Sequence, residues 1–435
     1  MLTSNSLKIV DNELLIGNVS TSELAKNFKT PLYVFDEEGI RKNCRAYVNS
    51  IKENYDGNGL VAYASKAFSC FAIYQIAKEE GLGIDVVSGG ELYTAHRINF
   101  PMDKVFFHGN NKTKEELELA VKYRVGTIVV DNLTELKMLI RLIEKANKNG
   151  EKIKQRIMLR IKPGVDAHTH NFIRTGQIDS KFGFAVETNE ATEAVNEALK
   201  YDCLDLVGIH CHIGSQIFDC NPFVVTAEIM MNFIADHPKA NLRELNLGGG
   251  FGIKYKSDDK PIEYDQYMKK IATKIKEVAH ERNIPCPKII IEPGRSIIGS
   301  EGITLYTVGS KKVIPNVRTY IAVDGGMGDN PRYALYGAEY EFLCANKAGE
   351  PKTETVTIAG RYCESGDLLG ENVKLQNVEP GDILAVLSTG AYNYSMASNY
   401  NRIPRPAVVL VNNGTVKEII ERETYEDIIS KDVIL

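Results

Sequence analysis

Residues with reactive or ionisable side chains follow several short apolar runs of this sequence, at the point where each run ends. Lys66 closes the run in AYASKAF. An amine beside an apolar wall is partly desolvated and easier to deprotonate, which suits a lysine that forms a Schiff base. The alternative is an ordinary solvated lysine, because most lysines are exposed. His210 and His212 stand two residues apart in GIHCHIGSQ, so both face one side of a strand, and Ser215 follows in a Gly-Ser turn.

Two further runs end in residues suited to an anion or a heterocycle. Three glycines at 248–250 follow ELNL. Successive glycines let backbone N–H groups approach a phosphate closely, although a tight strand exit would require glycine equally. The segment EPGR, from Glu292 to Arg295, follows KIII. A carboxylate there can keep a pyridine nitrogen protonated, and a guanidinium can hold a phosphate or carboxylate through two parallel hydrogen bonds.

The histidines admit two chemical interpretations. In the first, His212 lies against a flat aromatic cofactor and Ser215 donates to its phosphate, while His210 is a structural histidine. In the second, His210 and His212 bind a metal ion together with His168 and His170 of DAHTHNF, because His-x-His on a barrel strand can ligate zinc for hydrolysis. A metal site would leave the three glycines without a role, and EPGR is not an isolated ligand carboxylate. We therefore favour the cofactor and expect no metal.

The elements that must position these residues alternate in type along the chain. Apolar, β-branched runs alternate with segments of helical period, such as KEELELAVKYR and LTELKMLIRLIEKANK. Eight parallel strands with outer helices predict a closed (β/α)8 barrel, whose sites lie at the carboxyl ends of the strands. An open doubly wound sheet fits the alternation but gives no reason for reactive residues at so many strand ends. The eight runs are LVAYAS, IDVVS, KVFFHG, TIVVD, RIMLRIK, LVGIHCH, ELNLGGG and KIIIEPG.

After Arg295 the pattern changes to short strands separated by turn signals such as DGG and NNG. The strand-like runs there are TLYTVGSKKVI, VRTYIAVDGG, TETVTIAG, ILAVLS and RPAVVLVNNGTV. The first 35 residues contain LKIV, ELLIG and PLYVF, which are strand-like too. We therefore expect a barrel at 36–298 and a β-rich domain formed by 1–35 and 299–435.

Composition excludes several classes of partner. The chain of 435 residues has a formal net charge of -5, which gives no electrostatic reason to expect nucleic acid or an anionic membrane. No apolar run approaches the roughly 20 residues that span a bilayer, and the start lacks a signal core, so a cytoplasmic location is expected. Eight cysteines without a CxxC pair indicate reduced thiols rather than disulfides or zinc.

Ten segments, in order along nearly the whole chain, resemble the fold-type III family of pyridoxal-phosphate decarboxylases, and within it the branch that acts on diaminopimelate. In the β-rich part, no spacing rule alone would select the polar residues that these segments contain. The segments are YASKAF, DVVSGGEL, HGNNK, PGVDAHTHNFIRTGQIDSKFGF, HCHIGSQ, GGGFGI, EPGR, VDGGMGDNPRYALYG, CESGD and GAYNYSMASNYNRIPRPAVVLV.

The resemblance implies a role for each matching residue. Lys66 would link covalently to pyridoxal 5′-phosphate, His212 would stack on its ring, and Glu292 would pair with the ring nitrogen. Further cofactor-side positions are Asp85, Arg160, Ser215, Gly249, Gly250, Pro293, Gly294, Arg295 and Tyr392. Substrate-side positions are Arg295, Arg332, Tyr336, Glu364 and Tyr392. Cys363 matches the proton donor, which reaches the site from the neighbouring subunit, so the resemblance implies an obligate homodimer with two shared sites.

The reaction implied by the resemblance is decarboxylation of meso-2,6-diaminopimelate to L-lysine and carbon dioxide, the last step of lysine biosynthesis. Diaminopimelate has a second amino-acid end, whose carboxylate suits Arg332 and whose ammonium suits Glu364. Ornithine ends in a bare amine and would favour acids without an extra arginine. Two alternatives stay open: a decarboxylase of ornithine, arginine or a related carboxylated polyamine precursor, and a non-catalytic regulatory relative. The presence of Lys66 and Cys363 argues against the second alternative.

Overall fold

The computed structural model, which describes residues 2–165 and 179–435, divides the chain into two units. The barrel unit contains Cys44–Gly252 and Pro261–Gly294. The β unit contains Met1–Asn43, Ile253–Lys260 and Arg295–Leu435. The division into domains at 36–298 expected from the sequence stays a prediction. His168 and His170, which the metal interpretation invoked, lie outside the described residues.

Parallel strands form the centre of the barrel unit, and each apolar run expected from the sequence supplies one of them. The strands are β5 (Gly59–Ala64), β6 (Gly83–Val86), β7 (Val105–Phe107), β8 (Thr127–Val130), β9 (Gln155–Lys162), β11 (Leu204–His210), β12 (Glu244–Asn246) and β13 (Lys288–Ile291). They pair in the order β9-β11-β12-β13-β5-β6-β7-β8, and β8 pairs with β9. This last pairing closes the sheet, so the predicted barrel is confirmed over the described residues, and an open sheet is excluded. The short β10 (Phe184–Ala185) pairs with β9 outside this closed order.

The inside of the barrel is packed with side chains. One buried apolar cluster contains Ala62, Phe106, Val129, Met158 and Ile290, each from a different strand. Because β5 and β9 lie on opposite sides of the closed order, residues that meet in one cluster from both strands must point inward. The barrel is therefore a solid support, and its reactive residues stand at the rim.

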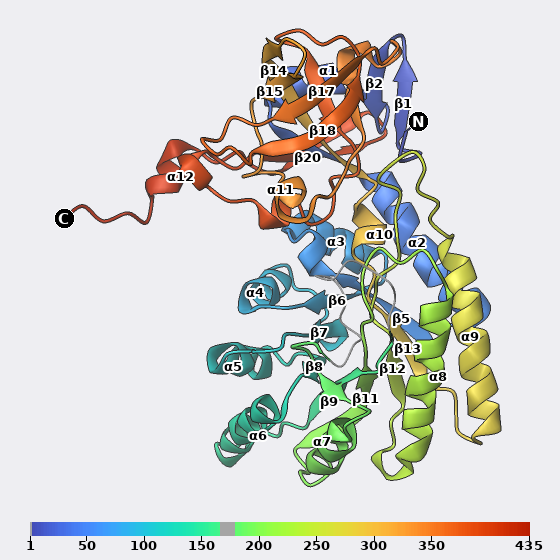
Figure 1. Cartoon of the computed structure of the whole chain (residues 1–435). Coiled ribbons are helices and arrows are strands. Elements are labelled where there is room, and N and C mark those ends of the chain that lie inside the picture. Colours follow the sequence, from blue (N-terminus) through green and yellow to red (C-terminus); the bar gives the residue numbers. More distant parts are fainter. Residues whose placement is uncertain (1, 166–178) are drawn as a thin grey trace. The chain divides into compact units, whose positions relative to one another are not determined.

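Helices surround the strands of the barrel unit (Figure 1). Both segments that the sequence singled out for helical period are helical, as α5 and α6, and their starts are capped. Thr113 and Glu116 form a capping box at the start of α5, and Asn132 accepts from the Glu135 N–H at the start of α6. The helices are α3 (Phe71–Glu79), α4 (Gly89–Arg97), α5 (Lys114–Lys122), α6 (Leu133–Lys148), α7 (Glu190–Ala198), α8 (Asn221–Asp236) and α9 (Tyr264–Glu281). The longer α2 (Glu37–Asn54) contains the chain boundary between the units.

The β unit is built on a second, mostly antiparallel sheet, and this confirms the β-rich expectation. The order along the sheet is β18-β17-β15-β14-β4-β20-β21, with β19 and β16 branching from β14. The strands are β4 (Leu32–Asp36), β14 (Gly302–Ile314), β15 (Arg318–Val323), β16 (Phe342–Cys344), β17 (Glu354–Ala359), β18 (Leu368–Leu375), β19 (Ile383–Val386), β20 (Ala407–Asn412) and β21 (Thr415–Ile420). The segment PLYVF thus joins this sheet as β4, between β14 and β20.

Two local features of the β unit follow directly from sequence. The segments LKIV and ELLIG form β1 (Leu7–Val10) and β2 (Glu13–Ile16) of a separate three-stranded sheet, completed by β3 (Val19–Ser20). The NNG signal makes a two-residue turn between β20 and β21, where Asn413 and Gly414 have φ of 46° and 85°. Positive φ at both positions is what a tight hairpin requires.

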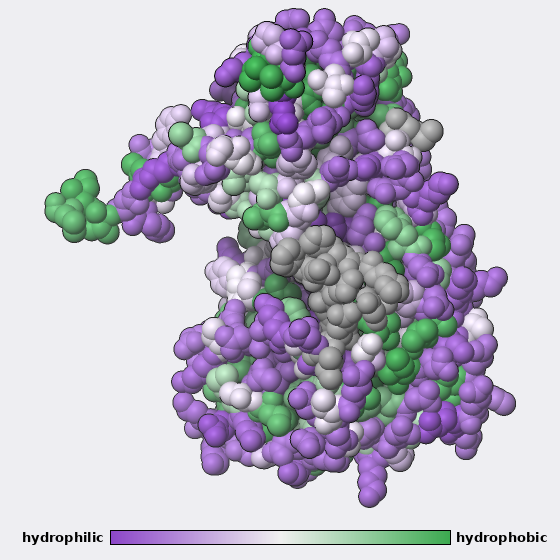
Figure 2. Space-filling model, in the orientation of Figure 1, coloured by the Kyte–Doolittle hydropathy of each residue, from purple (hydrophilic) through white to green (hydrophobic). Residues whose placement is uncertain are grey.

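Among the described residues, no helix has both the length and the apolar character needed to cross a bilayer. Apolar side chains do stand exposed at the C-terminal end, at Val433, Ile434 and Leu435 (Figure 2, green segment at the left). All eight cysteines carry free thiols.

Candidate active site

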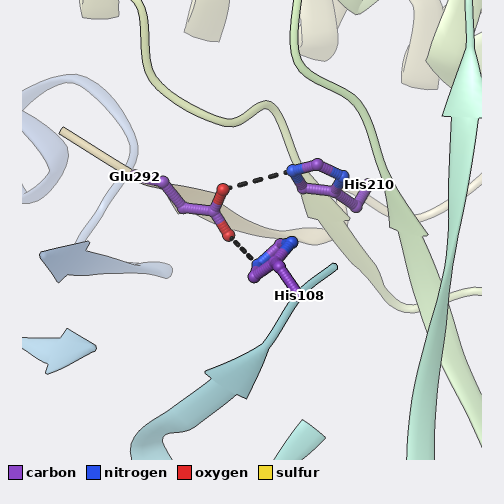
Figure 3. A group of neighbouring side chains, drawn as sticks. All are labelled: His108, His210 and Glu292. Carbon is purple, nitrogen blue, oxygen red and sulfur yellow. Dashed lines mark hydrogen bonds and ion pairs between the residues drawn. The ribbon is translucent and has the colours of Figure 1, made fainter. Parts of the chain in front are cut away.

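Glu292 directly follows β13, and its buried carboxylate lies beside His210, the last residue of β11, and His108, which follows β7 (Figure 3). Oε2 accepts a hydrogen bond of 3.1 Å from His210 Nε2, and Oε1 accepts one of 2.6 Å from Asn246 Nδ2. Nε2 of His108 lies 2.8 Å from Oε1, without the alignment of a hydrogen bond. Burial acts to raise the pKa of Glu292, but His108 and His210 hold it well below its usual value. Glu292 is therefore a carboxylate surrounded by donors.

Of the two histidines beside Glu292, the sequence singles out only His210 as a candidate site residue. His210 is the last residue of β11, and burial lowers its pKa to about 3, so it is neutral and donates through Nε2. His108 directly follows β7, and the sequence predicts no role for it, although its place at a strand end is an available signal. The centroids of the two imidazole rings lie 4.7 Å apart.

Lys66 and Asp85 form the next part of the rim. Lys66 lies two residues after the end of β5, in a short 3-10 turn at Ser65–Ala67, and its side chain is 43% exposed. Its Nζ atom lies 3.8 Å from Oδ2 of Asp85, a residue of β6 that is 1% exposed. Burial raises the pKa of Asp85, while His108 and Lys66 oppose that shift. Asp85 Oδ1 is buried and has no hydrogen-bond partner in the described part of the chain.

Arg160 lies on β9 and is held between an acid and an aromatic ring. Its Nε atom is 3.9 Å from Oδ1 of Asp131, and its guanidinium lies 4.2 Å from the ring centroid of Phe182. The side chain is 12% exposed, so the charge is mostly withdrawn from water. Arg160 therefore adds a fixed positive charge to the barrel rim.

His212 follows β11 and is fixed by the glycine segment. Its Nδ1 atom accepts a hydrogen bond of 3.3 Å from the Gly249 N–H. Burial, with Lys66 and Arg160 acting in the same direction, holds the pKa of His212 well below its usual value. The ring is therefore neutral, which suits stacking against a flat heterocycle.

The glycines at the rim are required by close packing of the chain. A Cβ on Gly249 would lie 2.1 Å from the Glu292 carbonyl oxygen, and one on Gly250, at φ +114°, would lie 2.4 Å from Gly214 O. This supports the tight-exit interpretation. The same contacts bring the glycine segment against Glu292 and against the turn that contains Ser215.

The EPG turn is tied to the end of β5 in the same way. The Ala64 N–H donates to Pro293 O at 3.1 Å, and a Cβ on Gly294 would lie 2.9 Å from Ala64 O. Lys66, two residues after Ala64, is thereby placed next to the turn that carries Glu292. The barrel unit thus gathers the expected cofactor residues from Lys66 to Gly294 at one end of its strands.

The remaining expected residues belong to the β unit, where two arginines share one tyrosine ring. Arg295 begins α10 (Arg295–Ile298), donates to the Tyr255 hydroxyl, and lies 4.7 Å from the Tyr392 centroid. Arg332 begins α11 (Arg332–Tyr336). Its guanidinium carbon lies 5.5 Å from the ring centroid of Tyr392 and 5.1 Å from that of Tyr336. We call these five residues the Arg-Tyr cluster. It joins four of the expected residues, and Tyr255 is a member that the sequence did not indicate.

Cys363 and Glu364 lie on an exposed turn of the β unit. The Cys363 N–H donates to Asn401 Oδ1 at 2.8 Å. Asp367 holds the turn by accepting from the Tyr362 N–H at 2.7 Å. Within the described residues, neither Cys363 nor Glu364 forms an ion pair or hydrogen bond with the Arg-Tyr cluster.

The cofactor expected from the sequence fits these residues. Pyridoxal phosphate needs an anionic acceptor for its ring nitrogen, and Glu292 is held ionised because its pKa is well below the usual value. It needs an amine beside that acceptor, and Lys66 lies at the same rim. The buried Asp85 Oδ1, which has no hydrogen-bond partner in the described residues, is the kind of atom that a polar ligand satisfies.

Comparison with protein families agrees with this geometry. Residues 38–299 match the family model described as pyridoxal-dependent decarboxylase, pyridoxal binding domain. Because this match covers more than half of the chain, the chain belongs to the pyridoxal-dependent decarboxylases, and the predicted family and cofactor are confirmed.

Individual relatives define the branch. The diaminopimelate decarboxylase of Bacillus subtilis (strain 168) is 50% identical over 426 residues, which cover 97% of this chain and 95% of the relative. That of Bacillus methanolicus is 50% identical over 94% of both chains. The crystal structure of diaminopimelate decarboxylase from M. jannaschii in complex with L-lysine has a TM-score of 0.91 and 37% identity, covering 100% of this chain and 99% of that one. Within its class, the chain belongs to the diaminopimelate decarboxylase family.

Proposed function

We propose that this chain is a carboxy-lyase that converts meso-2,6-diaminopimelate to L-lysine and carbon dioxide with pyridoxal phosphate as cofactor. The observation that carries the proposal is the 50% identity, along 97% of the chain, to an enzyme of that name. A solved relative in complex with L-lysine, the proposed product, supports the same substrate class.

Pyridoxal phosphate, when bound, supplies a ring that accepts the electron pair released with the carboxylate. Lys66 would hold its carbonyl carbon, His212 its ring face, and Glu292 its ring nitrogen. Because the pKa of Glu292 is held low, its carboxylate can keep a proton on that nitrogen. The phosphate would be held by Ser215, Gly249, Gly250, Pro293, Gly294, Arg295 and Tyr392, and Asp85 and Arg160 would complete the cofactor side.

The Arg-Tyr cluster supplies the positive charge that a dicarboxylate requires. The Nε atom of Arg332 is buried and has no hydrogen-bond partner among the described residues. A guanidinium placed over tyrosine rings keeps its edge available for a carboxylate. We assign Arg332 to the carboxylate at the far end of the substrate, and Glu364 to the ammonium beside it. Arg295, Tyr336 and Tyr392 complete the substrate side.

Cys363 is the proposed acid that returns a proton to the substrate α-carbon. Its thiol is exposed and its backbone is fixed by Asn401. Because Cys363 lies on an exposed turn, it can reach the active site of a second copy of the chain. We therefore propose a homodimer in which each subunit contributes Cys363 to the active site of the other. A cytoplasmic location is proposed with it, supported by eight free thiols.

A substrate panel tests this function. Purified protein with added pyridoxal phosphate is given diaminopimelate, ornithine, arginine and lysine separately, and release of carbon dioxide is measured. We expect release from diaminopimelate alone. Activity on ornithine or arginine without activity on diaminopimelate would favour a polyamine-precursor decarboxylase. No release from any substrate by protein that binds the cofactor would favour a regulatory relative.

The metal-dependent hydrolase that the sequence also admits has one candidate set of ligands among the described residues. His108, His210 and Glu292 offer ligand atoms that all lie within 4.8 Å of one another. Two histidines and a carboxylate can bind zinc. Elemental analysis of the purified protein, with and without added zinc, separates the candidates: stoichiometric metal together with failure to bind pyridoxal phosphate would support the hydrolase.

A further inference from the structure

We infer that His108 and His210 are positioning residues that clamp the Glu292 carboxylate across the mouth of the barrel and leave one acceptor site on Oε2 for the cofactor ring nitrogen. The inference rests on the proposed function, since it presumes pyridoxal phosphate. It adds His108 and His210 to the residues that position the cofactor, and it assigns the contact with the ring nitrogen to Oε2 of Glu292.

The clamp spans strands that are not neighbours of β13. In the closed order, β13 pairs with β12 and β5, whereas β11 and β7 lie further round on either side. His210 comes from β11 and His108 from the end of β7, and both rings point toward Glu292 (Figure 3). Contacts from both directions fix the carboxylate over the barrel opening.

The acceptor sites of Glu292 are unequally used. Each carboxylate oxygen has two lone pairs. Oε1 accepts from Asn246 at 2.6 Å, and His108 Nε2, at 2.8 Å, occupies its other approach. Oε2 accepts from His210 at 3.1 Å. Within the described residues, Oε2 therefore keeps one acceptor site.

His108 also lies between two acids. Its Nε2 atom is 2.8 Å from Glu292 Oε1 and 3.8 Å from Asp85 Oδ1. Both carboxyl groups are buried, and repulsion between them opposes the ionisation of both. Lys66 and Arg160 are the nearby cations. His108 therefore stands between the two carboxyl groups and keeps the Glu292 carboxylate in place on the Asp85 side.

A merely structural role would also explain two buried histidines, so the test must depend on the ring nitrogen. The apoenzyme and its His108→Phe and His210→Phe variants are titrated by calorimetry with pyridoxal phosphate and with the analogue that carries C–H in place of the ring nitrogen. His237→Phe is the matched control. That histidine is also in the barrel unit and is bonded to Phe233 O at 2.7 Å, and it lies at the end of α8 rather than at the rim.

We expect the parent and His237→Phe to prefer pyridoxal phosphate over the analogue. Each clamp variant should lose about tenfold or more of that preference, the effect of one hydrogen bond to a charged group, while its affinity for the analogue stays unchanged. His210→Gln keeps an N–H donor and should retain more of the preference than His210→Phe. It also serves if the phenylalanine variant does not fold.

Two outcomes overturn the inference while leaving the function intact: variants that lose affinity for both ligands equally, which is a structural effect, and variants whose preference equals that of the parent. A parent protein that binds neither ligand refutes the proposed cofactor itself, and with it the basis of the clamp.

Discussion

The ammonium of Lys66 lies 3.8 Å from the carboxylate of Asp85, although Lys66 is 43% exposed and Asp85 is 1% exposed. The two side chains come from neighbouring strands, since β5 and β6 pair with Ala64 opposite Asp85. An exposed lysine paired with a buried acid differs from an ordinary surface ion pair, in which both groups are solvated. This relation separates Lys66 from the solvated lysines of the chain.

Replacing Lys66 by alanine should abolish turnover and remove the visible absorption of the protein with its cofactor. This loss is expected because Lys66 is the amine proposed to bond to the carbonyl carbon of the cofactor. The measurement is an absorption spectrum alongside carbon dioxide release. Borohydride treatment of the parent, followed by peptide mass mapping, should find the cofactor on Lys66. Lys122→Ala, on the exposed face of α5, is the control and should change neither. A variant with a normal spectrum would refute the assignment.

Cys363→Ala should keep the visible band but slow product formation by about 10²- to 10⁴-fold, the usual contribution of a positioned acid. Cys286 is also exposed, and Cys286→Ala should turn over normally. Steady-state kinetics with diaminopimelate provide the comparison. Normal turnover by the Cys363 variant would remove it as the acid.

Mixing Lys66→Ala with Cys363→Ala protein, after reversible dissociation, should restore part of the activity. A mixed pair would contain one site with both residues intact if subunits exchange Cys363. The recovered rate is compared with the rate of each variant alone at the same protein concentration. Absence of recovery, in mixtures shown to contain mixed dimers, would argue against shared sites.

Gly249→Ala should destabilise the protein by about 1–3 kcal/mol, because its Cβ would lie 2.1 Å from the Glu292 carbonyl oxygen. The strain moves Glu292, so affinity for pyridoxal phosphate should fall as well. Gly90→Ala is the matched control. Its Cβ would meet only Ser88 Oγ at 3.7 Å, and alanine favours the helix. Thermal unfolding and titration with pyridoxal phosphate are measured for both variants. Equal stability of the two variants would show that the loop accommodates the added methyl group without strain.

Asp329→Asn should change how stability depends on pH. Asp329 is buried in the β unit and accepts from the Tyr306 hydroxyl, and burial raises its pKa to about 7. Between about pH 4 and 7 the folded protein keeps a proton that the unfolded chain has lost, so stability falls as pH rises through this window.

The amide that replaces the Asp329 carboxyl group has no such proton. The variant should therefore gain on the parent as pH rises from about 4 to 7, by on the order of 2–4 kcal/mol, and the gain should level off above. Urea unfolding at pH 5 and pH 8 measures the difference, with the exposed Asp258→Asn as control. A constant difference at both pH values would mean that Asp329 does not titrate there.

Local pattern determined most of the architecture. Each of the apolar runs became a barrel strand, KEELELAVKYR and LTELKMLIRLIEKANK became α5 and α6, and NNG became the β20–β21 turn. These signals are local, because burial of one face sets the period and turn residues set the backbone angles. The rim residues Lys66 and Glu292 could be found because they directly follow such runs.

The partners of those residues were decided by the tertiary structure alone. His210 and Glu292 are 82 residues apart and meet only because the strands close into a cylinder. The sequence did not indicate the roles of His108 and Tyr255. The pattern of apolar residues can predict that a side chain lies near the rim, but it cannot predict which other side chain it contacts. Which atoms touch depends on strand order, closure and packing, and these are properties of the whole fold.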